Sequence, residues 1–566
     1  MFMNDIATTE KIVGSFLGAA VGDALGWPNE DRSHRVGKRN QQAAVNGFLS
    51  WVRRKGWMAQ TFEEPILAGE YSDDTQLILA TARCLQCDLW WERLARVELP
   101  TWLLYERGGG IAVKRAARSW ASGKAPWEVV AEREKYWNAG GNGAAMRILP
   151  HVARDFDAND SILAANIVRN GLVTHGHPRA LVGATLYGFA LRVCMRQTNT
   201  LSFGALIDEL LQSRRDWAHF PDAATEAWRD SLSDGITSYK RLWDSVVVEA
   251  MKLLEIARSR IGRGALETGD EALREIGAFD RNTGGAGTVT ACSAIFLASR
   301  HAASPKQGVR SAASMIGTDA DTIASMTGAL LGAIHGRECL NSLAFAVQDA
   351  GYIEKLAHEV SSASVSASPI KPVSRNQLLQ FTKTLKSADK GKTLELPDGR
   401  RVTVKSRSPL PSRRVSAEEW RLSVEDGQTL AISISDRRTA VVSSGTLGAT
   451  RIGVQLYASD LHHAREFYET KLGLSLTSSA KHQLEFENVI TIAATDTFHF
   501  RDALGQESAP RVLINVANIK SVFTRLVGLG LHPSTIRSNE NGQACFCLTD
   551  PFGNRLEFVG SYSRTN

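Results

Sequence analysis

Residues 14–26 read GSFLGAAVGDALG and place a glycine at every fourth position, at 14, 18, 22 and 26. Positions four apart share one face of a helix, so this spacing predicts a helix with a smooth side against which a second helix packs closely. The pattern ends at Trp27-Pro28-Asn29, because the residue before a proline is disfavoured in a helix. Glu30 is therefore expected in a loop just after the helix end.

Two strings far apart in the chain combine paired carboxylates with hydroxyls. They are Ser72-Asp73-Asp74-Thr75 and Thr318-Asp319-Ala320-Asp321-Thr322, and each precedes an apolar helical stretch. A single acid or serine at a helix start is usually a cap. Two double-acid strings together with Glu30 instead favour a cation site, because buried carboxylates this close would repel one another. Mg²⁺ and related hard cations bind such oxygens.

Two glycine-rich loops each precede an apolar stretch: Gly140-Gly141-Asn142-Gly143 and Gly284-Gly285-Ala286-Gly287-Thr288. Backbone amides in such turns at helix starts bind phosphate, although a loop of this composition is more often a simple turn. Arg147 is expected either to neutralise charge nearby or to cap its helix. His175 is equally open, since a lone histidine is more often structural.

Five motifs, in the same order along the chain, resemble the ADP-ribosylglycohydrolase family over roughly residues 10–350. They are the glycine-face helix ending in Gly-Asp-Ala-Leu-Gly with Glu30 after it, the string at 72–75, the loop from Gly141 to Arg147, Thr174-His175-Gly176-His177, and the string at 319–322. The resemblance implies an all-α fold with a site for two metal ions, usually Mg²⁺ and otherwise Mn²⁺. That site holds the ribose of an ADP-ribose adduct.

Carried over position by position, the resemblance implies specific roles. Glu30 matches an acid on a mobile loop that covers the metals and takes part in gating and proton transfer. The implied metal ligands are Ser72, Asp73, Asp74, Asp319, Asp321 and Thr322. The implied substrate-binding residues are Asn142, Gly143, Ala144, His175, Gly285 and Gly287. One position departs from the family, because Thr318 stands where a second glycine commonly precedes the first Asp.

The same residues make chemical sense for cleaving a glycosidic bond at a ribose. That reaction passes through an oxocarbenium-like state and needs an oriented ring, an activated water and a protonated leaving group. Either Glu30 or Asp319 is the expected catalytic acid or base, and the sequence does not choose between them. The predicted function is a metal-dependent hydrolase that releases ADP-ribose from a modified target. The alternatives are a non-catalytic protein that binds ADP-ribose or a nucleotide, and sequestration of a small molecule by the last domain.

Composition changes along the 566 residues predict several domains. We expect an all-α domain over 1–360, a serine-rich linker over 361–370, a small β-rich domain over 371–447 and an α+β domain over 448–566. Residues 371–414 hold twelve Lys/Arg and three Asp/Glu, against a net charge of +6 for the whole chain. This excess allows contact with a polyanion, although a solvated face is the commoner reading. The β-rich half is expected to serve recognition or assembly and to be dispensable for chemistry.

Residues of roughly 450–562 repeat a βαβββ order and resemble the glyoxalase/bleomycin-resistance superfamily. The resemblance rests on Asp460-Leu461, Phe467-Tyr468, Leu472-Gly473 and the ending DPFGNRLE at 550–557. Catalytic members of that superfamily hold a metal at the start and near the end of each repeat. The matching positions here carry Gly453, Arg511 and Glu557, which do not make a metal site. A binding or dimerising module is therefore the expectation.

Seven cysteines scattered along the chain do not predict a disulfide framework, and no apolar run reaches the length of a membrane span. The expected location is the cytoplasm, with no membrane partner. The expected partner is an ADP-ribosylated protein, nucleic acid or small molecule, and the sequence leaves the acceptor open. The C-terminal domain is the expected place for any homo-oligomer contact.

Overall fold

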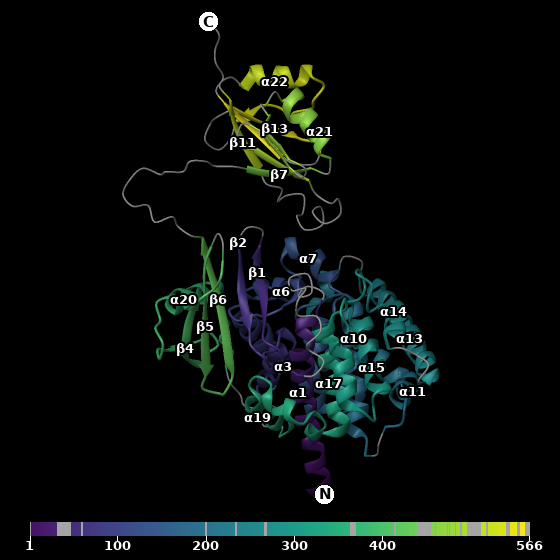
Figure 1. Cartoon of the computed structure of the whole chain (residues 1–566). Coiled ribbons are helices and arrows are strands. Elements are labelled where there is room, and N and C mark those ends of the chain that lie inside the picture. Colours follow the sequence, from purple (N-terminus) through teal and green to yellow (C-terminus); the bar gives the residue numbers. More distant parts are fainter. Residues whose placement is uncertain are drawn as a thin grey trace. The chain divides into compact units, whose positions relative to one another are not determined.

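The computed structural model describes residues 2–30, 47–57, 60–198, 201–232, 235–264, 269–362, 369–412 and 415–437 of the first of two compact units, Met1–Arg438. In the second unit, Thr439–Asn566, it describes residues 454–458, 460–472, 474, 476–480, 483–486, 490–494, 511–516, 519–538, 544–551 and 555–560. Both units are drawn in Figure 1.

A closely packed pair of helices forms the centre of the first unit. Helix α1 (Phe2–Gly26) lies against α17 (Ala320–His335), and Figure 1 shows α1 in purple beside α17 in teal. A Cβ added at Gly18 would lie 2.2 Å from the carbonyl oxygen of Gly328, and one at Gly22 would lie 2.0 Å from that of Ala324. The predicted glycine face is confirmed. Because the backbones touch, the ends of the two helices are held together.

Further helices surround this pair. In chain order they are η1 (Trp27–Asn29), α3 (Asp73–Cys84), α4 (Trp90–Arg93), η2 (Leu94–Glu98), α5 (Leu99–Trp102), α6 (Ile111–Ala121), α7 (Val130–Trp137), η3 (Asn142–Arg147), α8 (Leu149–Asp155), α9 (Asp160–Leu172), α10 (Pro178–Arg196), α11 (Ala205–Gln212), α12 (Arg214–Ala218), η4 (Asp222–Ala224), η5 (Glu226–Ser231), α13 (Gly235–Gly262), α14 (Gly269–Ile276), α15 (Gly287–Arg300), α16 (Pro305–Ala313), η7 (Arg337–Leu340), α18 (Ser342–Ala346), α19 (Ala350–Ser361) and α20 (Arg375–Lys386).

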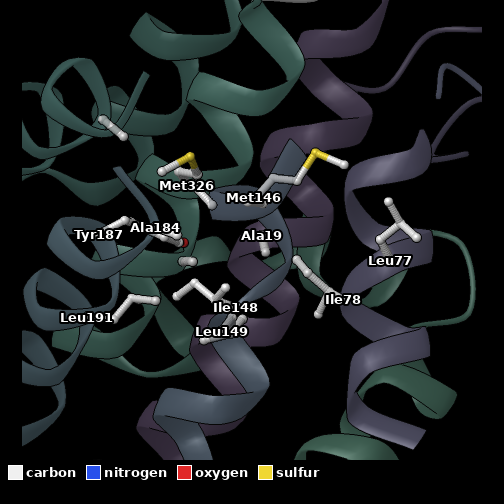
Figure 2. Close-up of a cluster of buried hydrophobic side chains, with 14 of the residues drawn as sticks. Ala19, Leu77, Ile78, Met146, Ile148, Leu149, Ala184, Tyr187, Leu191 and Met326 are labelled. Carbon is white, nitrogen blue, oxygen red and sulfur yellow. The ribbon is translucent and has the colours of Figure 1, made fainter. Parts of the chain in front are cut away.

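The core of the first unit is apolar and continuous. Figure 2 shows side chains from α1, α3, α10 and α17 meeting around the segment that joins η3 to α8, with Ile78, Ile148 and Leu191 among them. These three side chains are at most 2% exposed. Burying this apolar surface is the main favourable term in folding such a helical domain. The helical prediction for this region is confirmed.

One feature of the helical region was not predicted. An antiparallel hairpin of β1 (Trp51–Trp57) and β2 (Gln60–Ile66) follows α1. Its strand pattern is weak because charged residues occupy the middle of both strands. Trp51 nevertheless packs edge-on against Trp27, with ring centroids 5.2 Å apart, so the hairpin lies beside the end of α1.

The β-rich segment forms a four-stranded antiparallel sheet in the order β3-β4-β5-β6. Its strands are β3 (Thr393–Glu395), β4 (Arg401–Pro409), β5 (Val415–Val424) and β6 (Thr429–Arg437). The predicted turn at Asp398-Gly399 connects β3 to β4, and Gly399 has a φ of +90°, which suits glycine.

The sheet is part of the first compact unit, which ends at Arg438. The expected separate domain over 371–447 is therefore corrected. Leu422 and Val424 share the helical domain's apolar core, and that continuity, invisible in the sequence, joins the two. Of the expected linker, residues 363–368 lie outside the described residues. Just beyond it, Val373 is buried and its N–H donates to the carbonyl of Arg96 at 2.8 Å.

The second unit consists of two βαβββ repeats, as the sequence predicts. The first has β7 (Val454–Ala458), α21 (Leu461–Arg465) continued by η8 (Glu466–Lys471), β8 (Leu476–Ala480), β9 (Gln483–Phe486) and β10 (Ile490–Ala494). The second has β11 (Arg511–Val516), α22 (Ile519–Gly528), β12 (Arg537–Ser538), β13 (Ala544–Thr549) and β14 (Arg555–Gly560). In each repeat the first strand pairs in parallel with the last, β7 with β10 and β11 with β14.

The seven cysteines are free thiols. Among the described residues, no helix combines the length and apolar character that crossing a membrane requires.

Candidate active site

The end of α1 places the first acid. Residues Trp27–Asn29 form one short 3₁₀ turn, and the N–H of Glu30 donates back to the carbonyl of Trp27 at 3.3 Å. The Asn29 side chain donates to the carbonyl of Ala313 at 2.8 Å, which ties this turn to the end of α16. Glu30 is 5% exposed. It is thus a buried carboxylate just beyond the C-terminal end of α1, beside the start of α17.

The first acidic string begins α3, and a residue of α1 holds it there. Ser72 is the N-cap, and its Oγ accepts from the N–H of Asp74 at 3.4 Å. Asp23 accepts from the N–H of Ser72 at 3.0 Å and from the N–H and Oγ1 of Thr75 at 3.0 and 2.6 Å. Asp23 has no role among the sequence-based predictions. Its position could have indicated a role, because Asp23 is a carboxylate within an otherwise apolar stretch of its helix.

The second string begins α17, and it meets the first string and Glu30. Carboxylate oxygens of Glu30, Asp319 and Asp321 lie within 4.8 Å of one another. Thr322 Oγ1 donates to Asp74 Oδ2 at 3.2 Å and to Asp319 Oδ1 at 3.3 Å. Glu30, the first string 42 residues later and the second string more than 200 residues beyond that are therefore brought to one place.

Burial and mutual repulsion raise the pKa of two of these carboxyls, Asp74 and Asp321. Burial is the larger cause for Asp74, and the charges of Asp23, Asp73 and Asp319 raise its pKa further. Burial, followed by Glu30, Asp319 and Asp74, raises the pKa of Asp321. Asp74 Oδ1 is buried and finds no hydrogen-bond partner within the described part of the chain. A divalent cation relieves both the repulsion and the unpaired oxygen.

Asp73 lies beside the turn after Tyr105. Gly108 has a φ of +93°, and a Cβ added there would lie 2.9 Å from Asp73 Oδ1. Any side chain at 108 would therefore displace that carboxylate as well as strain the backbone. The sequence analysis did not single out this turn, since the run Gly108-Gly109-Gly110 looks like an ordinary loop.

The two glycine-rich loops bind each other beside Asp319. The N–H of Asn142 donates to the carbonyl of Gly285, and the N–H of Gly287 donates to that of Gly140, both at 3.0 Å. The Asn142 side chain donates to Asp319 Oδ2 at 2.9 Å. A Cβ on Gly285 would lie 3.6 Å from the same oxygen. Asn142 and Gly285 therefore border the acidic cluster.

Gly287 has a packing role in addition to the substrate role that the resemblance implies. Its N–H is already bonded, and a Cβ there would lie 2.6 Å from the carbonyl oxygen of Arg179 in α10. It lets α15 approach α10, so its amide is not available to a phosphate. Ala144 is fully buried in η3, and the carbonyl of Gly143 accepts from Arg147 at 3.0 Å.

His175 is a buried, neutral side chain behind the 140–143 loop. Burial, and then the charge of Arg147, lower its pKa to about 3. Its Nδ1 lies 2.7 Å from Thr174 Oγ1, and its ring would contact a Cβ on Gly143 at 3.0 Å. Arg147 is itself buried and donates to Asn170 and Thr174. It ties loops together rather than facing a substrate.

In this arrangement the residues present fit a divalent cation. The donors are carboxylate and hydroxyl oxygens, which hard cations prefer, and no nitrogen or sulfur ligand is among them. In the second unit, Glu557 lies half-buried on β14, while Gly453 and the side chain of Arg511 lie outside the described residues.

Comparisons with known proteins agree with these motifs. The family model described as ADP-ribosylglycohydrolase matches residues 4–369. The uncharacterized protein YegU of Escherichia coli (strain K12) is 28% identical over 365 residues, which cover 60% of this chain and 92% of that protein.

Two solved structures also show similarity. A structure titled ADP-ribosylglycohydrolase-related protein complex is 22% identical and covers 63% of this chain and 99% of its own, with a TM-score of 0.39. A bleomycin-binding protein complexed with bleomycin is 14% identical and covers 20% of this chain and 98% of its own, with a TM-score of 0.17. Because the family model spans more than half of the sequence, this chain belongs to the ADP-ribosylglycohydrolase family.

Proposed function

We propose that this protein is a metal-dependent hydrolase that cleaves the glycosidic bond between ADP-ribose and a modified target. One observation carries the proposal: Glu30, Asp74, Asp319 and Asp321 meet at the ends of α1, α3 and α17, with Asp74 Oδ1 unpartnered among the described residues. Membership of the family supports hydrolysis of ADP-ribose adducts. The metal is proposed to be two Mg²⁺ ions, with Mn²⁺ as the alternative.

The proposed ligands are the acids and hydroxyls of the two strings: Ser72, Asp73, Asp74, Asp319, Asp321 and Thr322. A bound cation would orient the ribose hydroxyls and lower the pKa of a water molecule. The chain itself fixes these ligands, because Asp23 holds the start of α3 and Thr322 links Asp74 to Asp319. Little rearrangement is then needed when substrate binds.

We assign the proton transfer to Glu30 and a binding role to Asp319. Both oxygens of Asp319 accept hydrogen bonds, Oδ1 from Thr322 and Oδ2 from the Asn142 amide. These two donors hold the Asp319 carboxylate in one orientation, which suits a metal ligand better than a group that moves a proton. Of the three clustered acids Glu30, Asp319 and Asp321, Glu30 alone does not belong to one of the two strings of proposed ligands. It is placed to hold or move the proton of the attacking water.

The substrate is proposed to lie over the paired loops. Gly285 has no side chain between its backbone and Asp319, and Asn142, Gly143 and Ala144 follow in the facing loop. Neutral His175 supports that loop from behind. The adduct's acceptor is proposed to be a protein side chain, a nucleic-acid base or a small molecule, and the C-terminal unit is proposed to serve recognition or self-assembly.

Contact with a polyanion through residues 371–414 receives less support. Several cations of this segment are paired with carboxylates: Lys386 with Asp436, Arg400 with Asp398, Arg401 with Glu425 and Arg407 with Glu418. The positive charge counted in the sequence is thus partly neutralised within the sheet. The remaining exposed lysines, such as Lys390, Lys392 and Lys405, are the proposed contact.

Incubation with a panel of ADP-ribosylated proteins, nucleic acids and small molecules tests the proposal, with ADP-ribose release measured in Mg²⁺, in Mn²⁺ and in excess chelator. We expect metal-dependent release from at least one substrate. Tight ADP-ribose binding without release from any member of the panel would instead establish the non-catalytic alternative. Release that a chelator leaves unchanged would contradict the metal.

A further inference from the structure

The sheet β3–β6 reaches the acidic site through a closed ring of four charged side chains. Arg107 donates to Glu70 at 2.7 Å and to Glu419 of β5 at 3.0 Å. Arg421, also on β5, donates to Glu419 at 2.8 Å and closes the ring at Glu70. Two members come from the helical region and two from the sheet. The side chains of Glu70, Arg107 and Glu419 are at most 8% exposed.

The two helical members of this ring stand next to the acidic site. Glu70 comes two residues before Ser72, where the first acidic string begins. Arg107 comes directly before Gly108, where an added Cβ would lie 2.9 Å from Asp73 Oδ1. The N–H of Arg107 also donates to the side chain of Gln76 in α3 at 3.3 Å. The ring therefore holds two segments that lie next to Asp73: the residues just before it in the chain, and the turn at Gly108.

A second contact from the sheet reaches Tyr71, the residue just before the same string. Thr429 of β6 donates to Asp349, through its N–H at 3.0 Å and through its Oγ1 at 2.7 Å. Asp349 in turn accepts from the hydroxyl of Tyr71 at 2.7 Å. Tyr71 lies between Glu70 and Ser72. Two adjacent residues that lead into the ligand string are thus held by two adjacent strands of the sheet.

We infer that the sheet β3–β6 positions the metal-binding string of the hydrolytic site, with Glu419 and Arg421 as positioning residues that act through Glu70 and Arg107. The sheet lies beyond residue 369, where the match to the family model ends. It is therefore an element that this chain adds to the family's site. The part of this inference that is tested by metal affinity rests on the proposed function.

The physical reason is that buried charges fix geometry when each has its partner. Removing one partner leaves the other buried and uncompensated, so the chain around it rearranges. Groups that orient metal ligands typically change metal affinity by about 10–100-fold when they are lost. Because Glu419 acts on Asp73 through Arg107 and Gly108, we expect an effect at the lower end, about tenfold.

The neighbouring residue provides a matched control. Glu418 is also on β5, but its side chain pairs with Arg407 at 2.7 Å on the exposed face of the sheet. In the full chain, Glu419→Gln and Glu418→Gln change the same group on the same strand. Mn²⁺ affinity is measured by titration calorimetry well below the melting temperature of each variant. Amide hydrogen exchange is followed in peptides covering 70–76 and 105–110.

We expect Glu419→Gln to weaken Mn²⁺ binding about tenfold and to speed exchange in both peptides, with Glu418→Gln resembling the wild type. If Glu419→Gln lowers only the melting temperature, with affinity and exchange unchanged, the sheet adds stability alone and the inference is wrong. A wild type that binds no Mn²⁺ would count against the proposed function, and the exchange data would still decide the inference. Should Glu419→Gln fail to fold, Thr429→Val removes the Oγ1 contact to Asp349, and unchanged exchange at 70–76 in that variant would overturn the inference.

Discussion

Thr322 Oγ1 donates to Asp74 Oδ2 at 3.2 Å, although the two residues are 248 positions apart in the sequence. The same hydroxyl donates to Asp319 Oδ1 at 3.3 Å. One threonine thereby links the first turn of α3 to the first turn of α17. Its neighbour Asp321 and the acid Glu30 complete a cluster of carboxylates whose mutual repulsion a bound cation would relieve.

Hydrolysis should require this cluster and a divalent ion. Asp321→Asn, or Asp319→Asn, replaces a charged ligand by a neutral amide, so release of ADP-ribose should fall by more than about 100-fold. Asp88→Asn, at an exposed position, is the control and should change nothing. Steady-state assays over a range of Mg²⁺ concentrations check this, and full turnover in strong chelator would disprove it.

Glu30→Gln should separate binding from chemistry. If Glu30 moves the proton, the amide lowers kcat by about 100-fold or more, in line with what general acid–base groups contribute, while the Kd for ADP-ribose changes little. Single-turnover rates and equilibrium titration of ADP-ribose measure the two effects independently. A weakened Kd with an unchanged kcat would make Glu30 a plain binding residue.

The sheet β3–β6 changes the expectation for truncated chains. A chain ending at Val360 leaves Arg107 without Glu419 and Arg83 without Gln428, which accepts from it at 3.2 Å. Arg107 keeps Glu70 and Arg83 keeps Glu98, so each loses one hydrogen bond to a buried charged group rather than its only partner. Each such loss costs about 1.5–3 kcal/mol, so we expect the melting temperature to fall by about 5 °C or more. A chain ending at Arg438 should melt cooperatively and keep activity on a small substrate. Equal stability of the two chains would refute this.

The contact between α1 and α17 should tolerate no side chain. Gly22→Ala places a Cβ about 2.0 Å from the carbonyl oxygen of Ala324, against backbone that cannot move aside. We expect a loss of stability of about 3 kcal/mol or more, the upper end for overpacking. Gly351→Ala in α19 is the control, since nothing lies within 4 Å there, and it should be neutral or stabilising by up to about 1 kcal/mol. Chemical denaturation measures both.

Stability should fall in acid through Glu64. This side chain is fully buried; burial alone would raise its pKa, but Lys55, Arg107 and Arg53 outweigh burial and lower the pKa from 4.5 to about 2. The folded state therefore holds fewer protons than the unfolded state below pH 5, so this contribution is complete above about pH 5 and is lost as the pH falls toward 2.

The shift of the Glu64 pKa corresponds to on the order of 3 kcal/mol. Denaturation curves between pH 6 and 3 should show a shallower pH dependence for Glu64→Gln than for the wild type. Glu63→Gln, at an exposed position on the same strand, should retain the wild-type slope. Parallel slopes for all three proteins would show that Glu64 does not titrate in this window.

The sequence predicted the glycine contact and the acidic strings because both depend on local spacing. The spacing of Gly18 and Gly22 indicates a close-packing helix face whatever packs on it, and the pair Asp319 and Asp321 indicates an acidic turn at a helix start. It did not predict that Glu419 belongs beside Glu70, since a strand residue gives no sign of which distant charge it meets. It also did not predict the packing role of Gly287, because a glycine for helix packing and a glycine for phosphate look alike in sequence.

The glycine contact described above has a consequence for how the site opens. Small residues four apart on α1 interlock with α17 in one register, and the next equivalent register lies four residues away, about 6 Å along the axis. A slip of that size would carry Glu30 away from Asp319 and Asp321 altogether. The α1–α17 pair therefore acts as a fixed frame, and any change in the distance between Glu30 and Asp321 must arise after Gly26, from rotation within the short turn that carries Glu30.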